Sequence, residues 1–198
     1  MNQGGRIYIR QESLRRLLWE KYENWRWQRA ENAMGRAFAH YDFDKQLESA
    51  LDRMVEKELN VVLLHEKGEH QAGQVVGDGW NKMVLDLGHS AAELMVRAVR
   101  DHWADCQVTL PQLLKDRDEA SLHFYIGGMT GMRKSLFPEL MKSYEKWYQD
   151  KNWQRFDQLV AEGQAHWSEL AVRLLDCYQS RPADSQTAIK LMVEENIL

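Results

Sequence analysis

A helical pattern of apolar residues with few interruptions is the feature that most constrains how this chain can fold. Apolar side chains recur at three- and four-residue spacing through most of the sequence, and only three prolines occur, Pro111, Pro138 and Pro182. This spacing places apolar side chains on one face of an α-helix. The one short run typical of a β-strand, residues 7–9, stands alone. The sequence therefore predicts an all-α fold.

Helix caps and breakers divide the pattern into six main helices and a short C-terminal tail helix. We expect them at about 11–39, 44–67, 79–106, 111–128, 138–150, 152–179 and 185–195. With 198 residues, and about 150 residues in an average domain, we expect one domain, 1–198, a mostly up-and-down bundle of five to six main helices.

Two segments are expected to lie outside these helices. Residues 1–10 are predicted to form an irregular N-terminal arm. Residues 68–79 contain four glycines and are predicted to form a glycine-rich connection, because glycine favours turns and loops over helix.

Charge and composition exclude several classes of protein. The chain has 26 Lys and Arg against 30 Asp and Glu, a net charge of −4, which argues against a nucleic-acid partner. Residues 6–36 are basic, with eight Lys or Arg and four Asp or Glu, and we interpret them as a helix docked on an acidic body. No apolar run approaches the ~20 residues of a membrane span. Two cysteines and no visible signal peptide predict a reduced, cytoplasmic setting.

Eight tryptophans are many for a chain of this length. Tryptophan is enriched in protein cores and at protein interfaces. We therefore expect a thick aromatic core or a dimer seam, which favours a homo-oligomer or a protein partner. The alternative is an aromatic pocket for a flat ligand.

Ionisable residues on the apolar face of the second helix are the main indication of chemistry. Glu58, His65 and Glu66 fall on the same face as Met54 and Val55, and Glu58 and His65 are two turns apart. A buried carboxylate is costly unless it is paired or binds a ligand. One interpretation is a metal or proton-transfer site inside the bundle.

The other interpretation is structural. Arg29 and Arg36 lie on the apolar stripe of the first helix, and either could pair with Glu58 or Glu66. Glu58 and His65 would then belong to an ion pair and a hydrogen-bonded histidine rather than to a site.

Two histidines on other helices could complete a metal site. His102 lies beside the apolar face of the third helix, and His123 lies at the border of the apolar stripe of the fourth. With Glu58, His65 and Glu66 they are candidate ligands for iron or another divalent metal, because di-iron bundles direct Glu and His inward from facing helices. The Glu-x-x-His pairs of a ferritin-like site are not present in full.

Further residues are candidate ligand or lid positions. His70 and Asp78 belong to the glycine-rich connection, which is either a linker or a lid. Gly127 and Gly128 interrupt a helical pattern, and Arg133 follows, so either close helix packing or a bound anion explains this break.

No catalytic motif accompanies these residues. The chain has no P-loop and no G-x-S-x-G elbow, and His65 and His70 are five apart, not four as in H-E-x-x-H. Two hypotheses remain. The protein acts by self-association or partner binding, or it is a metal-binding bundle protein of the non-haem iron type or an oxidoreductase. The sequence leaves open whether it is an enzyme.

Overall fold

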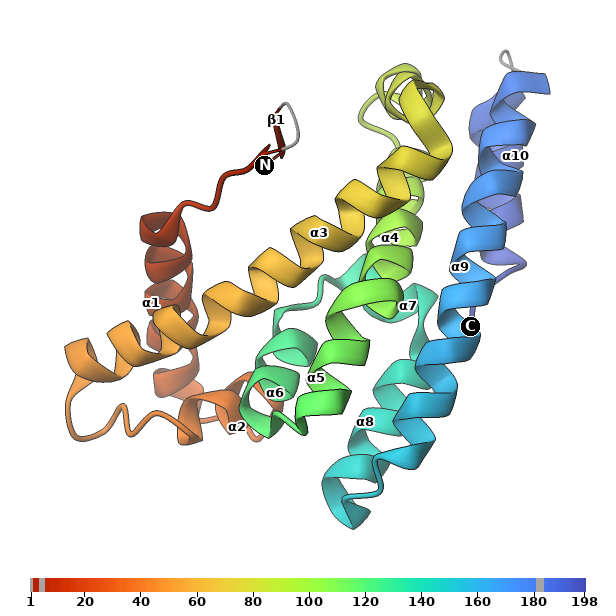
Figure 1. Ribbon diagram of the computed structural model, residues 1–198. Helices are drawn as coiled ribbons and strands as arrows, with labels where there is room; N and C mark the ends of the chain where they lie inside the picture. The colour runs from red at the N-terminus through yellow and green to blue at the C-terminus, as the bar shows by residue number, and fades with distance from the viewer. Residues whose placement is uncertain (1, 4–5, 181–183) are drawn as a thin grey trace.

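The structure is a computed structural model that describes residues 2–3, 6–180 and 184–198 (Figure 1). Its α-helices are α1 (Gln11–Gln28), α2 (Ala33–Ala39), α3 (Leu47–Leu87), α4 (Ala91–Ala104), α5 (Leu110–Asp116), α6 (Glu119–Gly128), α7 (Gly131–Leu136), α8 (Pro138–Asp150), α9 (Gln154–Ser180) and α10 (Ser185–Glu194).

Three further elements are short. A π-helix, η1 (Asp105–Thr109), joins α4 to α5, and two-residue strands β1 (Asn2–Gln3) and β2 (Arg6–Ile7) pair antiparallel, with Asn2 opposite Ile7. The predicted all-α class is confirmed. The described residues contain more helices than the five to six main helices expected, because several expected helices are divided. None of the helices in the described ranges has the length and apolar character needed to cross a membrane.

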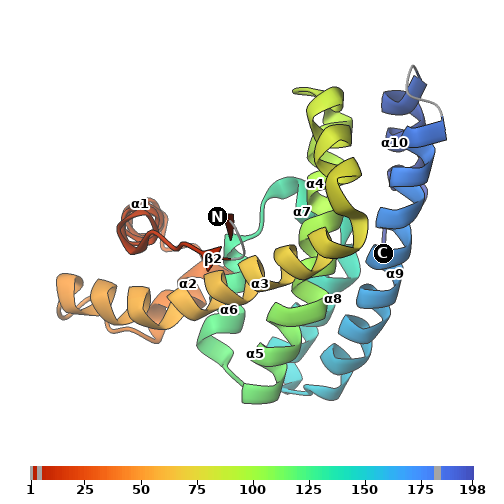
Figure 2. The ribbon, with the colours of Figure 1, turned by 45° about the horizontal axis from the view of Figure 1, so that its top comes forward.

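Helix α3 is the longest element and runs obliquely across the molecule (Figures 1 and 2). Its first half packs against α1, and its second half runs beside α4. Helix α4 also packs against α7, α9 and α10, while α2 packs on α6 and α8 on α9. Side chains that α3 and α4 direct toward each other therefore meet near the middle of α3.

The helix expected over residues 11–39 is two helices. Arg29 ends α1 in the left-handed conformation, with φ 47°, and the side chain of Asn32 accepts a hydrogen bond from the Gly35 nitrogen at 2.9 Å to begin α2. The indole nitrogen of Trp25 donates to the Ala30 carbonyl at 2.8 Å and fixes the turn between them. A good N-cap and the hydrogen bond of a partly buried indole therefore outweigh the continuous apolar pattern.

The expected glycine-rich connection over 68–79 is helical instead. Helix α3 continues through it, and within α3 only Gly77 has non-helical angles, φ 63° and ψ −164°, where the helix kinks. Gly68 faces α4 so closely that a Cβ there would lie 2.4 Å from the Ala104 carbonyl oxygen. These glycines form a kink and a close helix contact, not a linker, because each costs only about 1 kcal/mol in a helix that tertiary packing supports.

The expected helix start at Pro111 lies inside one continuous helical run, α4–η1–α5. A proline inside a helix lacks an N–H and clashes with the carbonyl four residues earlier, here that of Gln107. The π turn Asp105–Thr109 lies immediately before Pro111, and we attribute this local widening to the proline. π turns of this kind occur often at functional sites.

Tryptophans occupy both the core and the surface. Trp80, Trp147 and Trp167 are almost completely buried, whereas Trp27 is 79% exposed and Trp19 is 44% exposed. The aromatic core expected from composition is present, and α1 carries exposed indoles in addition.

Candidate functional site

The carboxylate of Asp105 is the centre of a buried polar cluster. It lies at the first position of η1 and is fully buried. Its Oδ1 is 2.8 Å from His65 Nδ1 and accepts the Thr109 hydroxyl at 2.8 Å. Its Oδ2 accepts the Tyr125 hydroxyl at 3.1 Å and the guanidinium of Arg133. Four donors from α3, η1, α6 and α7 therefore converge on one carboxylate.

This convergence keeps Asp105 charged. Burial acts to raise the pKa of Asp105, but the charges of Arg133 and His65 and the hydrogen bonds of His65 and Thr109 lower that pKa well below its usual range. Burial likewise acts to lower the pKa of His65, and the charge and hydrogen bond of Asp105, with Asp101 and Glu69 nearby, raise it to about 9. The imidazole therefore donates Nδ1–H to Asp105, and Nε2 is the nitrogen left for another partner.

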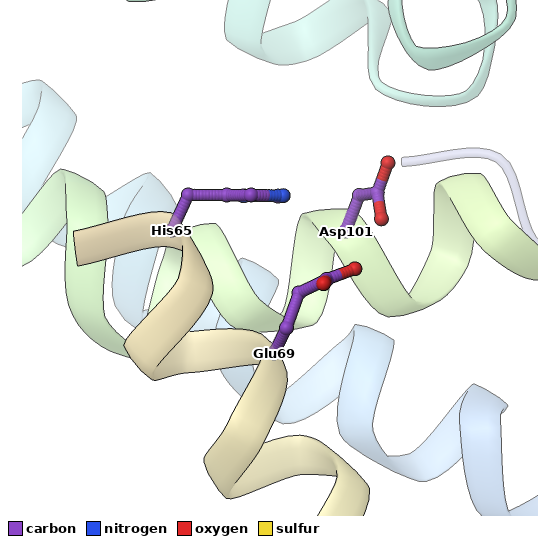
Figure 3. A group of neighbouring side chains, drawn as sticks. All are labelled: His65, Glu69 and Asp101. Atoms are coloured by element: carbon purple, nitrogen blue, oxygen red, sulfur yellow. The ribbon is translucent and has the colours of Figure 1, made fainter. Parts of the chain in front are cut away.

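Three potential metal ligands, one of which is His65 itself, lie beside this cluster. One ligand atom from each of His65, Glu69 and Asp101 lies within 4.8 Å of the other two. His65 and Glu69 project from α3 toward Asp101, which lies on α4 (Figure 3). All three side chains are partly buried. The close approach of α3 and α4 at Gly68 brings them together.

Two arginines border the three ligands. Arg100 Nη2 donates to Glu69 Oε1 at 2.5 Å, which leaves the second oxygen of Glu69 for another partner. Burial raises the pKa of Asp101 to about 6, while the charges of Arg133 and His65 oppose the rise. Arg100 occupies one oxygen of Glu69. The second oxygen of Glu69 and the carboxylate of Asp101 can therefore hold a small cation.

Glu58 lies in α3 two turns before His65 and has different partners. It is fully buried, and its Oε1 accepts the Tyr41 hydroxyl at 2.5 Å. Burial raises the pKa of Glu58 to about 7, although the hydrogen bonds of Tyr41 and Ser121 oppose this. The structure therefore does not bring Glu58 into the group around His65.

The two histidines proposed as further ligands are also held elsewhere. His102 Nε2 is 2.9 Å from the Arg133 carbonyl oxygen, and its ring stacks on Trp167. His123 Nδ1 is 2.7 Å from the Tyr144 hydroxyl. Burial, with nearby positive charge, lowers the pKa of His102 to about 3 and that of His123 to about 4. Both are neutral, buried histidines near pH 7.

The remaining candidate residues lie around the same part of α3 or on α6 and α7. Glu66, His70 and Asp78 line a surface depression of about 480 Å³ beside the kink, which Glu69 and Arg100 also line. In addition, Gly128 and Arg133 line a cavity that contains the His65–Asp105 pair. Gly127 instead packs on α2, where a Cβ would lie 2.7 Å from the Met34 nitrogen.

The expected pairing of Arg29 or Arg36 with the acidic residues of α3 is wrong. Arg29 Nη2 binds Asp44 at 2.9 Å, and Arg36 Nη1 binds Glu145 at 3.1 Å and the Tyr144 hydroxyl at 3.2 Å. The turn between α1 and α2 directs both arginines away from the buried part of α3. Glu58 is consequently bonded to a hydroxyl rather than to a cation.

Sequence reasoning missed Glu69, Asp101 and Asp105 as members of a site. The signal was present, since His65 and Glu69 are four apart, and Asp101 and Asp105 are four apart as well. Residues four apart lie on one face of a helix. Two such pairs on helices that pack together form a four-residue polar cluster.

The architecture defines an all-α helical protein with a polar cluster between its two central helices. The chain belongs to a family of unknown function, DUF6866: the model of the family's C-terminal domain matches residues 15–196. No curated protein and no solved structure matches the chain.

Proposed function

We propose that this protein binds a divalent transition-metal ion through His65, Glu69 and Asp101. The observation that carries the proposal is that three ligand atoms from α3 and α4 lie within 4.8 Å of one another. Two ligands at 2.0–2.2 Å from a tetrahedral zinc ion lie about 3.3–3.6 Å apart. The ligand atoms would therefore have to approach one another by up to about 1.5 Å to complete the coordination.

The hydrogen bond between Asp105 and His65 supports the proposal. A metal-binding histidine almost always donates its second N–H to a carboxylate or carbonyl, which fixes the ring and increases its basicity. Asp105 accepts from His65 Nδ1 at 2.8 Å and is itself held by three further donors. The orienting partner that a metal-bound imidazole requires is thus already in place.

The donor set indicates the kind of ion. One imidazole nitrogen and two carboxylate oxygens suit zinc, manganese or iron(II) better than magnesium or calcium, which prefer oxygen ligands alone. Three protein ligands leave at least one coordination position open, as in sites that exchange ligands. The partial burial of all three residues supports access from solvent.

A metal titration tests the proposal. The purified protein is stripped with a chelator and titrated with Zn²⁺ and with Mn²⁺ by calorimetry. We expect one ion per chain, and at least tenfold weaker binding in Glu69→Gln and in Asp101→Asn. Glu66→Gln is the matched control, since it removes a carboxylate from the same part of α3 outside the ligand group and should bind as the wild type does.

Circular dichroism of each variant separates loss of binding from loss of fold. Wild-type protein that takes up neither ion at equimolar concentration would overturn the proposal. Equal affinity in Glu69→Gln, Asp101→Asn and the wild type would overturn it as well.

A second candidate function is self-association through α1. Trp19 and Trp27 are eight residues apart with Glu23 midway, so they lie along one stripe of the helix, and they are 44% and 79% exposed. Exposed tryptophans are typical of interfaces. Light scattering of the wild type and of the double variant Trp19→Lys/Trp27→Lys tests this function. Leu85→Lys is the matched control, because Leu85 is 78% exposed but lies near the C-terminal end of α3, outside α1.

If α1 mediates a homodimer, the wild type and Leu85→Lys are dimers and the double tryptophan variant is a monomer. A monomeric wild type at the highest concentration reached would exclude this second function and leave the metal site unaffected.

A further inference from the structure

A small cavity adjoins the proposed metal site. It measures about 160 Å³ and lies where α3, η1, α6 and α7 meet. Val61, Val62 and Phe124 form its apolar wall, and His65, Tyr125 and Arg133 form its polar end. His65 belongs to both the cavity lining and the proposed ligand group, so the cavity and the proposed metal site share this imidazole.

Arg133 has hydrogen-bonding capacity that the described residues do not use. Its side chain is only 13% exposed. Its Nη2 donates to Asp105 and, at 3.0 Å, to the Tyr125 hydroxyl, and its Nε is buried without a hydrogen-bond partner in the described part of the chain. A guanidinium carries five N–H donors, and a planar oxyanion is its best partner.

The charge of the cluster depends on the ion. Glu69, Asp101 and Asp105 supply three negative charges and Arg100 and Arg133 two positive charges. A divalent ion adds two positive charges to this cluster, in place of at most one on the His65 imidazole. The metal-loaded site therefore attracts an anion more strongly than the empty site does.

We propose that the cavity binds a small aliphatic monocarboxylate when the metal is bound. The carboxylate lies between the ion and Arg133, and the aliphatic chain lies against Val61, Val62 and Phe124. The cavity has room for a small molecule, since its volume of about 160 Å³ is several times the ~10–15 Å³ that a single water needs on this measure. This inference rests on the proposed metal site.

Calorimetry on the Mn²⁺-loaded protein, with acetate, butyrate and 1-butanol as ligands, tests the inference. We expect butyrate to bind about tenfold more tightly than acetate, because two more methylenes are buried. We expect 1-butanol, which lacks the carboxylate, to bind at least tenfold more weakly than butyrate. Butyrate affinity should fall at least fivefold when Mn²⁺ is removed.

Val62→Phe is the variant that distinguishes binding of butyrate in the cavity from binding of the metal ion. It fills the apolar wall at a partly exposed position and leaves all charges unchanged, so Mn²⁺ should bind as in the wild type while butyrate binding is lost. Protein that binds Mn²⁺ but binds butyrate no better than 1-butanol would overturn this inference alone. Protein that binds neither Zn²⁺ nor Mn²⁺ would overturn the proposed function, and this inference with it.

Discussion

Asp105 Oδ1 lies 2.8 Å from Nδ1 of His65, and this contact joins the middle of α3 to the π turn that follows α4. The two residues are forty positions apart, and the same Asp105 oxygen also accepts the Thr109 hydroxyl from within the π turn. The pair is a specific polar contact between these two elements. The contribution of Asp105 to stability can be measured through another of its partners, Arg133.

Removing Asp105 should destabilise the fold strongly. Asp105→Ala leaves Arg133 buried without its counter-charge, and breaking a buried pair in this way costs about 3–5 kcal/mol. We expect the double variant Asp105→Ala/Arg133→Ala to be less destabilised than the sum of the two single variants, by about 1–3 kcal/mol. Urea unfolding of the four proteins gives this coupling energy. Strictly additive effects would show that the two side chains do not stabilise each other.

Glu58 should make the protein less stable as pH rises. Burial raises the pKa of Glu58 from 4.5 to about 7 in the folded chain. A raised carboxyl pKa means that the folded state holds the proton more tightly, so stability is greatest below pH 4.5 and falls until the pH passes about 7. The loss amounts to about 3 kcal/mol at ~1.4 kcal/mol per pKa unit. Glu58→Gln keeps an acceptor for Tyr41 and removes the titration.

The measurement is the difference in free energy of unfolding between wild type and Glu58→Gln at pH 4.5 and at pH 8. We expect the free energy of unfolding of Glu58→Gln, relative to that of the wild type, to be higher at pH 8 than at pH 4.5. Tyr41→Phe removes a hydrogen bond that lowers the pKa of Glu58, so the decline in its stability should extend to higher pH than in the wild type. Lys57 and Asp118 form an ion pair at 2.8 Å beside this carboxyl. A constant difference between wild type and Glu58→Gln would mean that Glu58 titrates normally.

The helical class and the inward direction of Glu58 and His102 could be predicted from the sequence. Apolar spacing fixes which face of a helix is buried, and both residues lie on or beside that face and are fully buried. Their partners could not be predicted in the same way. Tyr41 reaches Glu58 from the loop after α2, and the Arg133 carbonyl reaches His102 from α7, so these contacts depend on tertiary packing.

The candidate site was predicted in part for the same reason. His65 was recognised by its position on α3, but its neighbours Glu69 and Asp101 lie at the edge of the apolar faces, where periodicity does not distinguish a solvated residue from a paired one. Reading 68–79 as a connection also separated Glu69 from the helix that carries His65. The sequence does not show that α3 stays helical through Gly68, where α3 and α4 come together.

Gly68→Ala should open the contact between α3 and α4. A Cβ at Gly68 would lie 2.4 Å from the Ala104 carbonyl oxygen, and backbone atoms cannot move aside as a flexible side chain can. We expect a loss of about 1–3 kcal/mol, measured by urea unfolding. Gly73→Ala is the control on the same helix, since nothing lies within 4 Å of its Cβ position, and it should gain about 0.5–1 kcal/mol. Equal effects of the two substitutions would contradict a close contact at Gly68.

Asp105→Asn should weaken metal binding although Asp105 is not itself one of the three ligands. The substitution keeps the shape of the side chain but removes the charge that holds the His65 ring through Nδ1. Loss of such an orienting partner costs about 10–100-fold in metal affinity, and Zn²⁺ calorimetry on folded variant protein measures it. Thr109→Val is the control, because it removes a different hydrogen bond to the same Asp105 oxygen, 2.8 Å long, and leaves the His65 contact intact. If Asp105→Asn bound Zn²⁺ as tightly as Thr109→Val, the imidazole of His65 would not be a ligand, and the ion would have to be held by carboxylates alone.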